Sequence, residues 1–222
     1  MMSMPRFDSD RLTSSNEVEI ENLTTLPTIN SRHWHSLIDA SYKGNNEAKQ
    51  IGMREGYKLD EELSNRKHKV FRDKHDTTII AFTGSRTFGD VITDGALVVG
   101  LHGLTYRFAD STRLVDKVKE KYKHSPIMAV GHSLGARLGE YVNETTGVDR
   151  VVSVQKGTGL FDIGKRLKSN QTDIHSNTDW VSVLSNTQVG GKHINNPGTL
   201  IFDPLYSHSY SHLKKFGNKD RF

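Results

Sequence analysis

The stretch that decides the fold reads Gly131-His132-Ser133-Leu134-Gly135-Ala136. It matches the pattern G-x-S-x-G, in which a serine occupies a sharp turn between a strand and a helix. An apolar run, residues 126–130, precedes it and is typical of a buried strand, while residues 136–142 can continue as a helix. The flanking glycines leave room for the close backbone approach that such a turn requires. The sequence therefore predicts a strand, a strained turn and a helix, with Ser133 as a candidate nucleophile.

The same pattern also fits an ordinary strand-to-helix turn with an incidental serine, because glycine is frequent in this chain, at 19 residues. A nucleophilic serine needs a general base, an acid that orients the base, and hydrogen-bond donors for an oxyanion. The catalytic hypothesis therefore depends on whether the rest of the chain supplies these groups in a workable order.

Length and composition favour a globular α/β protein. The chain has 222 residues, of which 34% are hydrophobic and 25% charged, and this is enough for one domain with a substantial core. We expect a loose polar extension over residues 1–30 and a single domain over residues 31–222. No apolar run approaches the ~20 residues of a membrane span, and the first 30 residues lack the order of a secretory signal. We therefore expect a cytoplasmic or virion-associated protein.

The absence of cysteine excludes a disulfide framework and a thiolate metal site. The net charge is +4, and basic residues gather at 66–69, at 117–123 and near the C-terminus. We interpret these groups mainly as solvated surface, with contact to anionic lipid headgroups or nucleic acid as the alternative. No nucleic-acid motif accompanies them. We expect no nucleic-acid partner and, at most, transient contact with a membrane surface.

Apolar segments alternate along the chain with segments of helical spacing. Such alternation predicts an α/β fold with a mostly parallel sheet flanked by helices. The expected helices cover residues 32–42, 46–54, 106–122, 136–142 and 208–216, and the expected strands cover residues 69–72, 77–82, 126–130, 151–154, 172–175 and 199–202.

Two stretches together resemble the class 3 lipases, the fungal-type branch of the α/β-hydrolases. The run Ile79-Ile80-Ala81-Phe82-Thr83-Gly84-Ser85, followed by Asp90 and Asp94, is similar to that family's strand and Phe-x-Gly-Ser/Thr loop with an acidic pair downstream. Val130 to Ala136 is similar to its nucleophile turn, including the histidine before the serine. The stretch 101–104 resembles a segment that lies between them. The resemblance covers roughly residues 57–216 and implies an α/β-hydrolase that cleaves lipid esters.

The resemblance also implies roles for particular residues. Ser133 is the nucleophile, and the backbone N–H groups of Ser85 and Leu134 are the oxyanion donors. Residues 177–181 resemble the family's Asn-Asp-x-Val segment, which makes Asp179 the triad acid. Its position after the serine and before the last histidines independently fits the chain order of this fold. Asp162, in a glycine-rich loop after the strand 151–154, is the alternative acid.

Three histidines follow Asp179 and could be the base: His193, His208 and His212. We favour His208, because it immediately precedes a predicted closing helix and could reach back over the serine. His208 and His212 form an i, i+4 pair, which is also a metal-ligand spacing. No third ligand is evident, and we expect neither a metal nor a cofactor.

Three further polar residues have structural interpretations. His132, beside the nucleophile, is expected to pack away from the reacting face. Asp90 and Asp94 are expected to act as caps or hydrogen-bond anchors of the oxyanion loop. Arg137 replaces the small residue usual in the family, and it either meets an anionic group of the substrate or faces solvent.

These residues predict a serine hydrolase that cleaves carboxylic esters of lipids, as a lipase, esterase or phospholipase. The span 94–106 leaves little room for a long amphipathic lid, and this favours a small esterase or phospholipase over a strongly interface-activated lipase. Two alternatives remain. An acyltransferase could use the same triad with an alcohol in place of water, and a non-catalytic α/β-hydrolase domain could serve as a binding module.

Overall fold

The computed structural model describes residues 31–85, 101–158, 162–176 and 187–196. Within these ranges, seven strands form one sheet whose spatial order follows the chain. The strands are β1 (Lys58–Asp60), β2 (His68–Arg72), β3 (Thr78–Phe82), β4 (Ile127–His132), β5 (Arg150–Val154), β6 (Arg166–Ser176) and β7 (Val189–Asn196). β1, β2 and β3 pair antiparallel, whereas β3 to β7 are all parallel. The carboxyl ends of these five parallel strands therefore meet at one edge, where open α/β sheets carry their sites.

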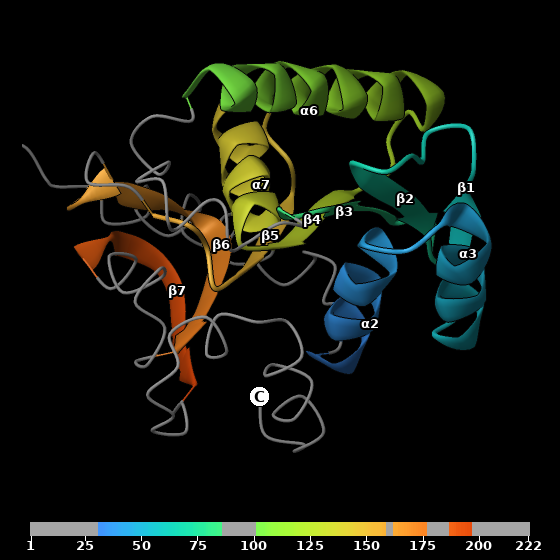
Figure 1. The fold of residues 1–222 in the computed structure, drawn as a ribbon, viewed down its shortest axis with the longest axis horizontal. Coiled ribbons are helices and arrows are strands. Elements are labelled where there is room, and N and C mark those ends of the chain that lie inside the picture. Colours follow the sequence, from blue (N-terminus) through green and yellow to red (C-terminus); the bar gives the residue numbers. More distant parts are fainter. Residues whose placement is uncertain (1–30, 86–100, 159–161, 177–186, 197–222) are drawn as a thin grey trace, which may run out of the picture.

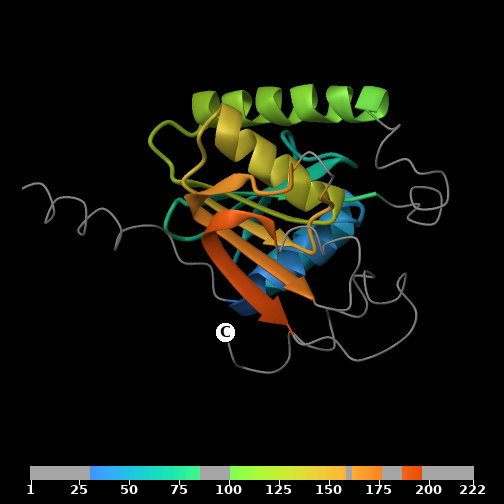
Figure 2. The same ribbon diagram turned by 90° about the vertical axis from the view of Figure 1, so that its left-hand side faces the viewer.

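Helices cover both faces of the sheet, which gives three layers (Figures 1 and 2). Helices α2 (Ser31–Ser41) and α3 (Asn45–Arg54) lie on one face, and α6 (Leu101–Lys121) and α7 (Leu134–Thr145) lie on the other. This mostly parallel sheet with flanking helices confirms the predicted fold class. No helix in the described ranges combines the length and the apolar character needed to cross a bilayer.

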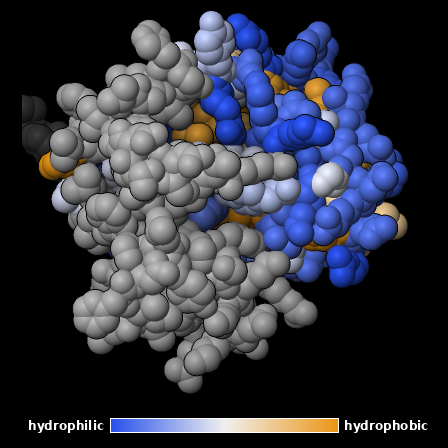
Figure 3. Space-filling view, viewed as in Figure 1, coloured by the Kyte–Doolittle hydropathy of each residue, from blue (hydrophilic) through white to orange (hydrophobic). Residues whose placement is uncertain are grey.

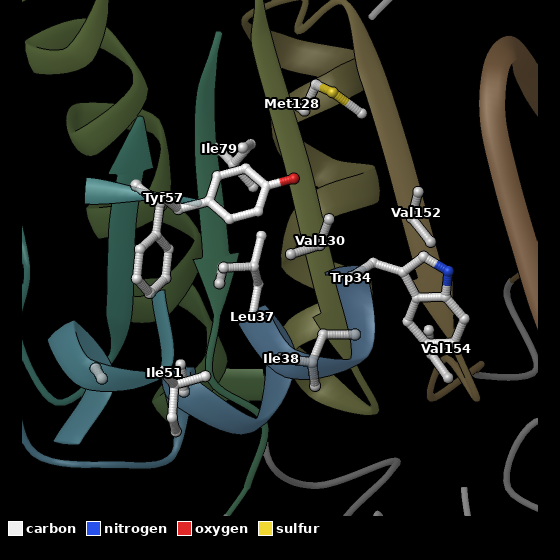
Figure 4. Packing of buried hydrophobic residues seen from close by; sticks show 14 of the residues in the cluster. Trp34, Leu37, Ile38, Ile51, Tyr57, Ile79, Met128, Val130, Val152 and Val154 are labelled. Atoms are coloured by element: carbon white, nitrogen blue, oxygen red, sulfur yellow. The ribbon is translucent and has the colours of Figure 1, made fainter. Parts of the chain in front are cut away.

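The central strands are buried on both faces, because successive side chains of a strand point to opposite sides. In β3, Ile79 and Ala81 join the cluster under α2, whereas Ile80 and Phe82 join the cluster under α6 and α7. Figure 4 shows Trp34 of α2 packed with its helix neighbours over the strands. Each large aliphatic side chain buried in this way contributes about 1.5–3 kcal/mol. This double burial explains why the strands read as continuous apolar runs in the sequence.

Two strands were not predicted from the sequence. β1 has only three residues, and β7 contains Gly190 and Gly191, whose φ angles are 77° and 63°. Paired glycines read as a turn, but here they lie beside a register shift between β6 and β7. A Cβ on Gly190 would lie 2.8 Å from the carbonyl oxygen of Leu167, so the close approach of β6 requires glycine. The predicted strand 199–202 and helix 208–216 lie outside the described residues.

Candidate active site

Ser133 occupies the turn between β4 and α7 in a strained conformation. Its φ is 57° and its ψ is −123°, a region that costs an L-residue about 1–3 kcal/mol. Three backbone hydrogen bonds hold it there, one of which runs from the N–H of Gly157 to the Ser133 carbonyl at 3.5 Å. Its N–H donates to the carbonyl of Val154 at 3.0 Å, and its carbonyl accepts the N–H of Arg137 at 3.2 Å. The strand, turn and helix predicted from the sequence are thus present, with the serine held in the conformation of a nucleophile elbow.

Two glycines allow α7 to begin directly against the sheet. A Cβ on Gly131 would lie 2.3 Å from the carbonyl carbon of Gly135, and a Cβ on Gly135 would lie 2.3 Å from the carbonyl oxygen of Phe82. Both contacts are with backbone, which has no freedom to rotate away. The first turn of α7 is therefore fixed against the ends of β3 and β4.

The expected oxyanion loop lies at the same edge. Residues 83–85 follow β3, and a Cβ on Gly84 would lie 2.7 Å from the carbonyl oxygen of His132 and 3.5 Å from Cβ of Ser133. Ser85 follows immediately in the chain and is partly exposed. Leu134 is the first residue of α7, where a backbone N–H has no acceptor within the helix. The fold thus brings together Ser133, Leu134 and the loop that contains Ser85.

A tyrosine that the sequence did not single out connects this loop to the turn that contains Ser133. The hydroxyl of Tyr42, just after α2, accepts the N–H of Gly84 at 3.1 Å and lies 3.2 Å from Nδ1 of His132. Nε2 of His132 lies 3.3 Å from Oε1 of Gln155. These contacts fit the His132 tautomer that carries its proton on Nε2. His132 is buried, as expected from the sequence, and no sequence pattern marks Tyr42 or Gln155.

Arg137 takes neither of the two roles considered for it. Its guanidinium lies 2.7 Å from Oδ1 of Asp162 and forms a second ion pair with Glu140. Glu140 also binds the ammonium groups of Lys156 and Lys165. Arg137 is therefore part of an internal ion cluster that ties α7 to the segment after β5. Asp162, the alternative triad acid, is engaged in the same cluster.

The deepest part of this ion cluster is almost inaccessible to solvent. Lys156 is 1% exposed, and its Nζ lies 2.5 Å from Oδ2 of Asp173 in β6. Burial by itself would raise the pKa of Glu140. The charges of Lys156 and Arg137, with hydrogen bonds from Lys156 and Lys165, outweigh burial and lower this pKa to about 2. Glu140 is therefore charged throughout the physiological range.

The remaining site residues predicted from the sequence are distributed as follows. Asp179 and His208 lie outside the described residues, as do Asp90, Asp94 and His212. His193 is exposed within β7, and its Nε2 lies 3.0 Å from the carbonyl oxygen of Gly190.

Sequence comparison finds no matching protein-family model and no matching curated protein. Among solved structures, Lip2 lipase from Yarrowia lipolytica superposes with a TM-score of 0.54 and 16% sequence identity, covering 84% of this chain and 82% of that chain. The chain has the fold of a fungal lipase. The Penicillium cyclopium protein MDLA, studied as a mutant, gives a TM-score of 0.46 at 13% identity, covering 87% of this chain and 85% of that one. The Rhizopus microsporus var. chinensis lipase gives a TM-score of 0.43 at 15% identity, covering 77% of this chain and 69% of that chain.

In this fungal-lipase fold, the strained serine lies where parallel strands end and the first turn of a helix begins. The partial positive charge at a helix N-terminus favours an anion at that place. Within the described ranges, no group of three or more His, Asp or Glu side chains could hold a metal ion.

Proposed function

We propose that this protein is a serine hydrolase that cleaves carboxylic esters of lipids. The observation that carries the proposal is the strained Ser133 at the end of β4, with the loop of Gly84 and Ser85 packed against it. Strain of this size persists only where the surrounding structure holds it, and it is concentrated at functional sites. The fold shared with fungal lipases supports the same conclusion.

The order of strands supports the choice of acid and base. Asp179 follows β6 in the sequence and His208 follows β7, and both strands end at the same sheet edge as β4. Asp162 is paired with Arg137, which makes it the weaker candidate for the acid. His193 lies within a strand rather than after one, so His208 remains the preferred base and His212 its alternative.

The proposed reaction is acyl transfer to water. His208 removes the Ser133 proton while Oγ bonds to the ester carbonyl carbon, and Asp179 orients the imidazole. The carbonyl electron pair moves to oxygen, where the N–H groups of Ser85 and Leu134 stabilise it; one such donor is typically worth about 10²–10³ in turnover. When the pair returns, the C–O bond breaks and the alcohol leaves with the proton from His208. Water then releases the acid by the same steps.

Labelling with a fluorophosphonate probe tests this function. We expect the wild type to label and Ser133→Ala to remain unlabelled. Ser153→Ala is the matched control, because its hydroxyl is buried one strand away, 3.5 Å from the carbonyl of Ala136. Because Ser133 is only 4% exposed, labelling should be measured with and without detergent.

A folded wild type that stays unlabelled under both conditions would contradict the proposal and favour the non-catalytic binding module. If labelling succeeds, release of free acid from esters in water, with and without an added alcohol, separates hydrolase from acyltransferase.

A further inference from the structure

A cationic cavity lies between the α2–α3 connection and the residues that lead into β2. Its volume is about 620 Å³, within the range of about 300–1,000 Å³ typical of small-molecule sites. Three of its lining residues are cationic, and none of the described residues that line it is a carboxylate. The lining residues are Lys43, Gly44, Asn45, Asn65, Arg66 and Lys69.

Residues adjacent in the chain to the cavity lining are hydrogen-bonded to the oxyanion loop. At the end of α2, before Lys43, the carbonyl of Ser41 accepts the hydroxyl of Thr83 at 2.7 Å, and the hydroxyl of Tyr42 accepts the N–H of Gly84 at 3.1 Å. After Arg66, the carbonyl of Lys67 accepts the N–H of Thr83 at 3.0 Å. The cavity is therefore connected through neighbouring residues to the loop that packs against Ser133.

The three cations differ in their surroundings. Lys69 is 1% exposed, and its ammonium donates to the carbonyl of Asn65 in the cavity wall. Lys43 is partly exposed and lies 3.1 Å from Glu47, which is not part of the lining. Arg66 is exposed, and none of the described carboxylates forms an ion pair with it. Cationic groups that line a concave surface raise the local concentration of anions.

The backbone contributes in the same direction. Gly44 is the N-cap of α3 and provides no side-chain cap for the first amides of this ten-residue helix. Such amides, together with the helix dipole, favour phosphate and carboxylate groups. The described residues on the face in Figure 3 are mainly hydrophilic, and the hydrophobic ones occur there as separate spots. The cationic side chains of the lining and the first amides of α3 suit an anionic headgroup better than an acyl chain.

We propose that this cavity binds the phosphate of the substrate headgroup, so that the preferred substrates are acyl esters of glycerol phosphate. The inference rests on the proposed function, because it places the phosphate in the cavity while the ester carbonyl lies at Ser133. Lys43 and Arg66 would make the charge-assisted hydrogen bonds, which are about twice as strong as neutral ones.

Paired substrates provide the first test. The values of kcat/KM are compared for 1-acylglycerol 3-phosphate and for 1-acylglycerol with the same acyl chain. We expect the wild type to prefer the phosphate ester at least about tenfold, which corresponds to roughly 1.4 kcal/mol. The double variant Lys43→Gln/Arg66→Gln should lose this preference but keep its activity on acylglycerol and its fluorophosphonate labelling. Lys74→Gln is the control, because Lys74 is exposed in the β2–β3 turn at the opposite edge of the sheet.

Calorimetry provides the second test, which does not depend on turnover. Glycerol 3-phosphate should bind to Ser133→Ala and bind at least about tenfold more weakly when Lys43 and Arg66 are also replaced. Binding of inorganic phosphate alone, without a substrate preference, would show an anion site separate from the substrate and overturn the proposal.

The remaining outcomes separate this inference from the proposed function. Hydrolysis of acylglycerol without any preference for the phosphate ester would overturn the headgroup site and leave the hydrolase intact. A protein that neither labels nor hydrolyses either ester would overturn the hydrolase. In that case, binding of glycerol 3-phosphate would still support a phosphate site in the cavity. Failure to bind glycerol 3-phosphate would overturn the phosphate site as well.

Discussion

Replacing Gly135 by alanine tests whether the close contact of α7 with the sheet positions the site. Within a helix this change normally stabilises by about 1 kcal/mol. Here the new Cβ would lie 2.3 Å from the carbonyl oxygen of Phe82 and 3.2 Å from the backbone nitrogen of Gly84. Because these are backbone atoms, α7 or the oxyanion loop must move. Overpacking of this kind typically costs about 1–3 kcal/mol.

A second glycine in the same helix provides a matched control. A Cβ on Gly139 would lie 3.4 Å from Cγ1 of Val151 and 3.7 Å from Cβ of Ala129. These are contacts between side chains, and at most a few tenths of an ångström of adjustment accommodates them. Gly139→Ala should therefore leave stability unchanged or raise it by up to about 1 kcal/mol, with activity retained.

The assay combines thermal unfolding with ester hydrolysis and fluorophosphonate labelling. Each kcal/mol lost should lower Tm by about 2–4 °C in a chain of this size. We expect Gly135→Ala to lower Tm and to reduce the labelling rate of the folded protein at least tenfold, because a displacement of about 1 Å can reduce catalysis about a hundredfold. If the two alanine variants matched the wild type equally in Tm and labelling rate, the proposed role of the close contact would be refuted.

Two further substitutions test the contacts around the site. Tyr42→Phe removes the acceptor of the Gly84 N–H and should lower the free energy of unfolding by about 1–3 kcal/mol. The control is Tyr57→Phe, which loses a hydroxyl contact of 3.1 Å with Nδ1 of His33, remote from the loop. Tyr42→Phe should slow fluorophosphonate labelling more than this control does. Equal labelling rates would assign Tyr42 a purely structural role. The pKa of Glu140 is lowered from 4.5 to about 2. Its ionisation therefore contributes about 3 kcal/mol to the free energy of unfolding, and this contribution is complete above pH 4.5 and is lost as the pH falls towards 2. Glu140→Gln removes one carboxylate partner of Lys156 and should strongly destabilise the protein at pH 7. In urea unfolding, the difference in free energy between this variant and the wild type should shrink as the pH falls from 4.5 towards 2. A difference that stays constant over this pH range would contradict the lowered pKa.

Local patterns in the sequence were sufficient for the central elements. The apolar run before Ser133, the glycines around it and the helical spacing after it fixed the elbow, because each signal depends on neighbours within one or two turns of chain. The hairpin of β2 and β3 was readable for the same reason. β7 was not, since a strand that contains Gly190 and Gly191 has the local signature of a turn.

The tertiary structure alone decided what surrounds Ser133. Tyr42 meets Gly84 and His132 only because α2 packs across the sheet and ends at its carboxyl edge. Arg137 and Glu140 of α7 join an ion cluster with Lys156 and Asp162, which come from the segment after β5. The cationic cavity likewise forms where the α2–α3 connection approaches the turn before β2. Contacts between residues far apart in the chain depend on how whole elements pack, and packing leaves no periodic signal in a single sequence.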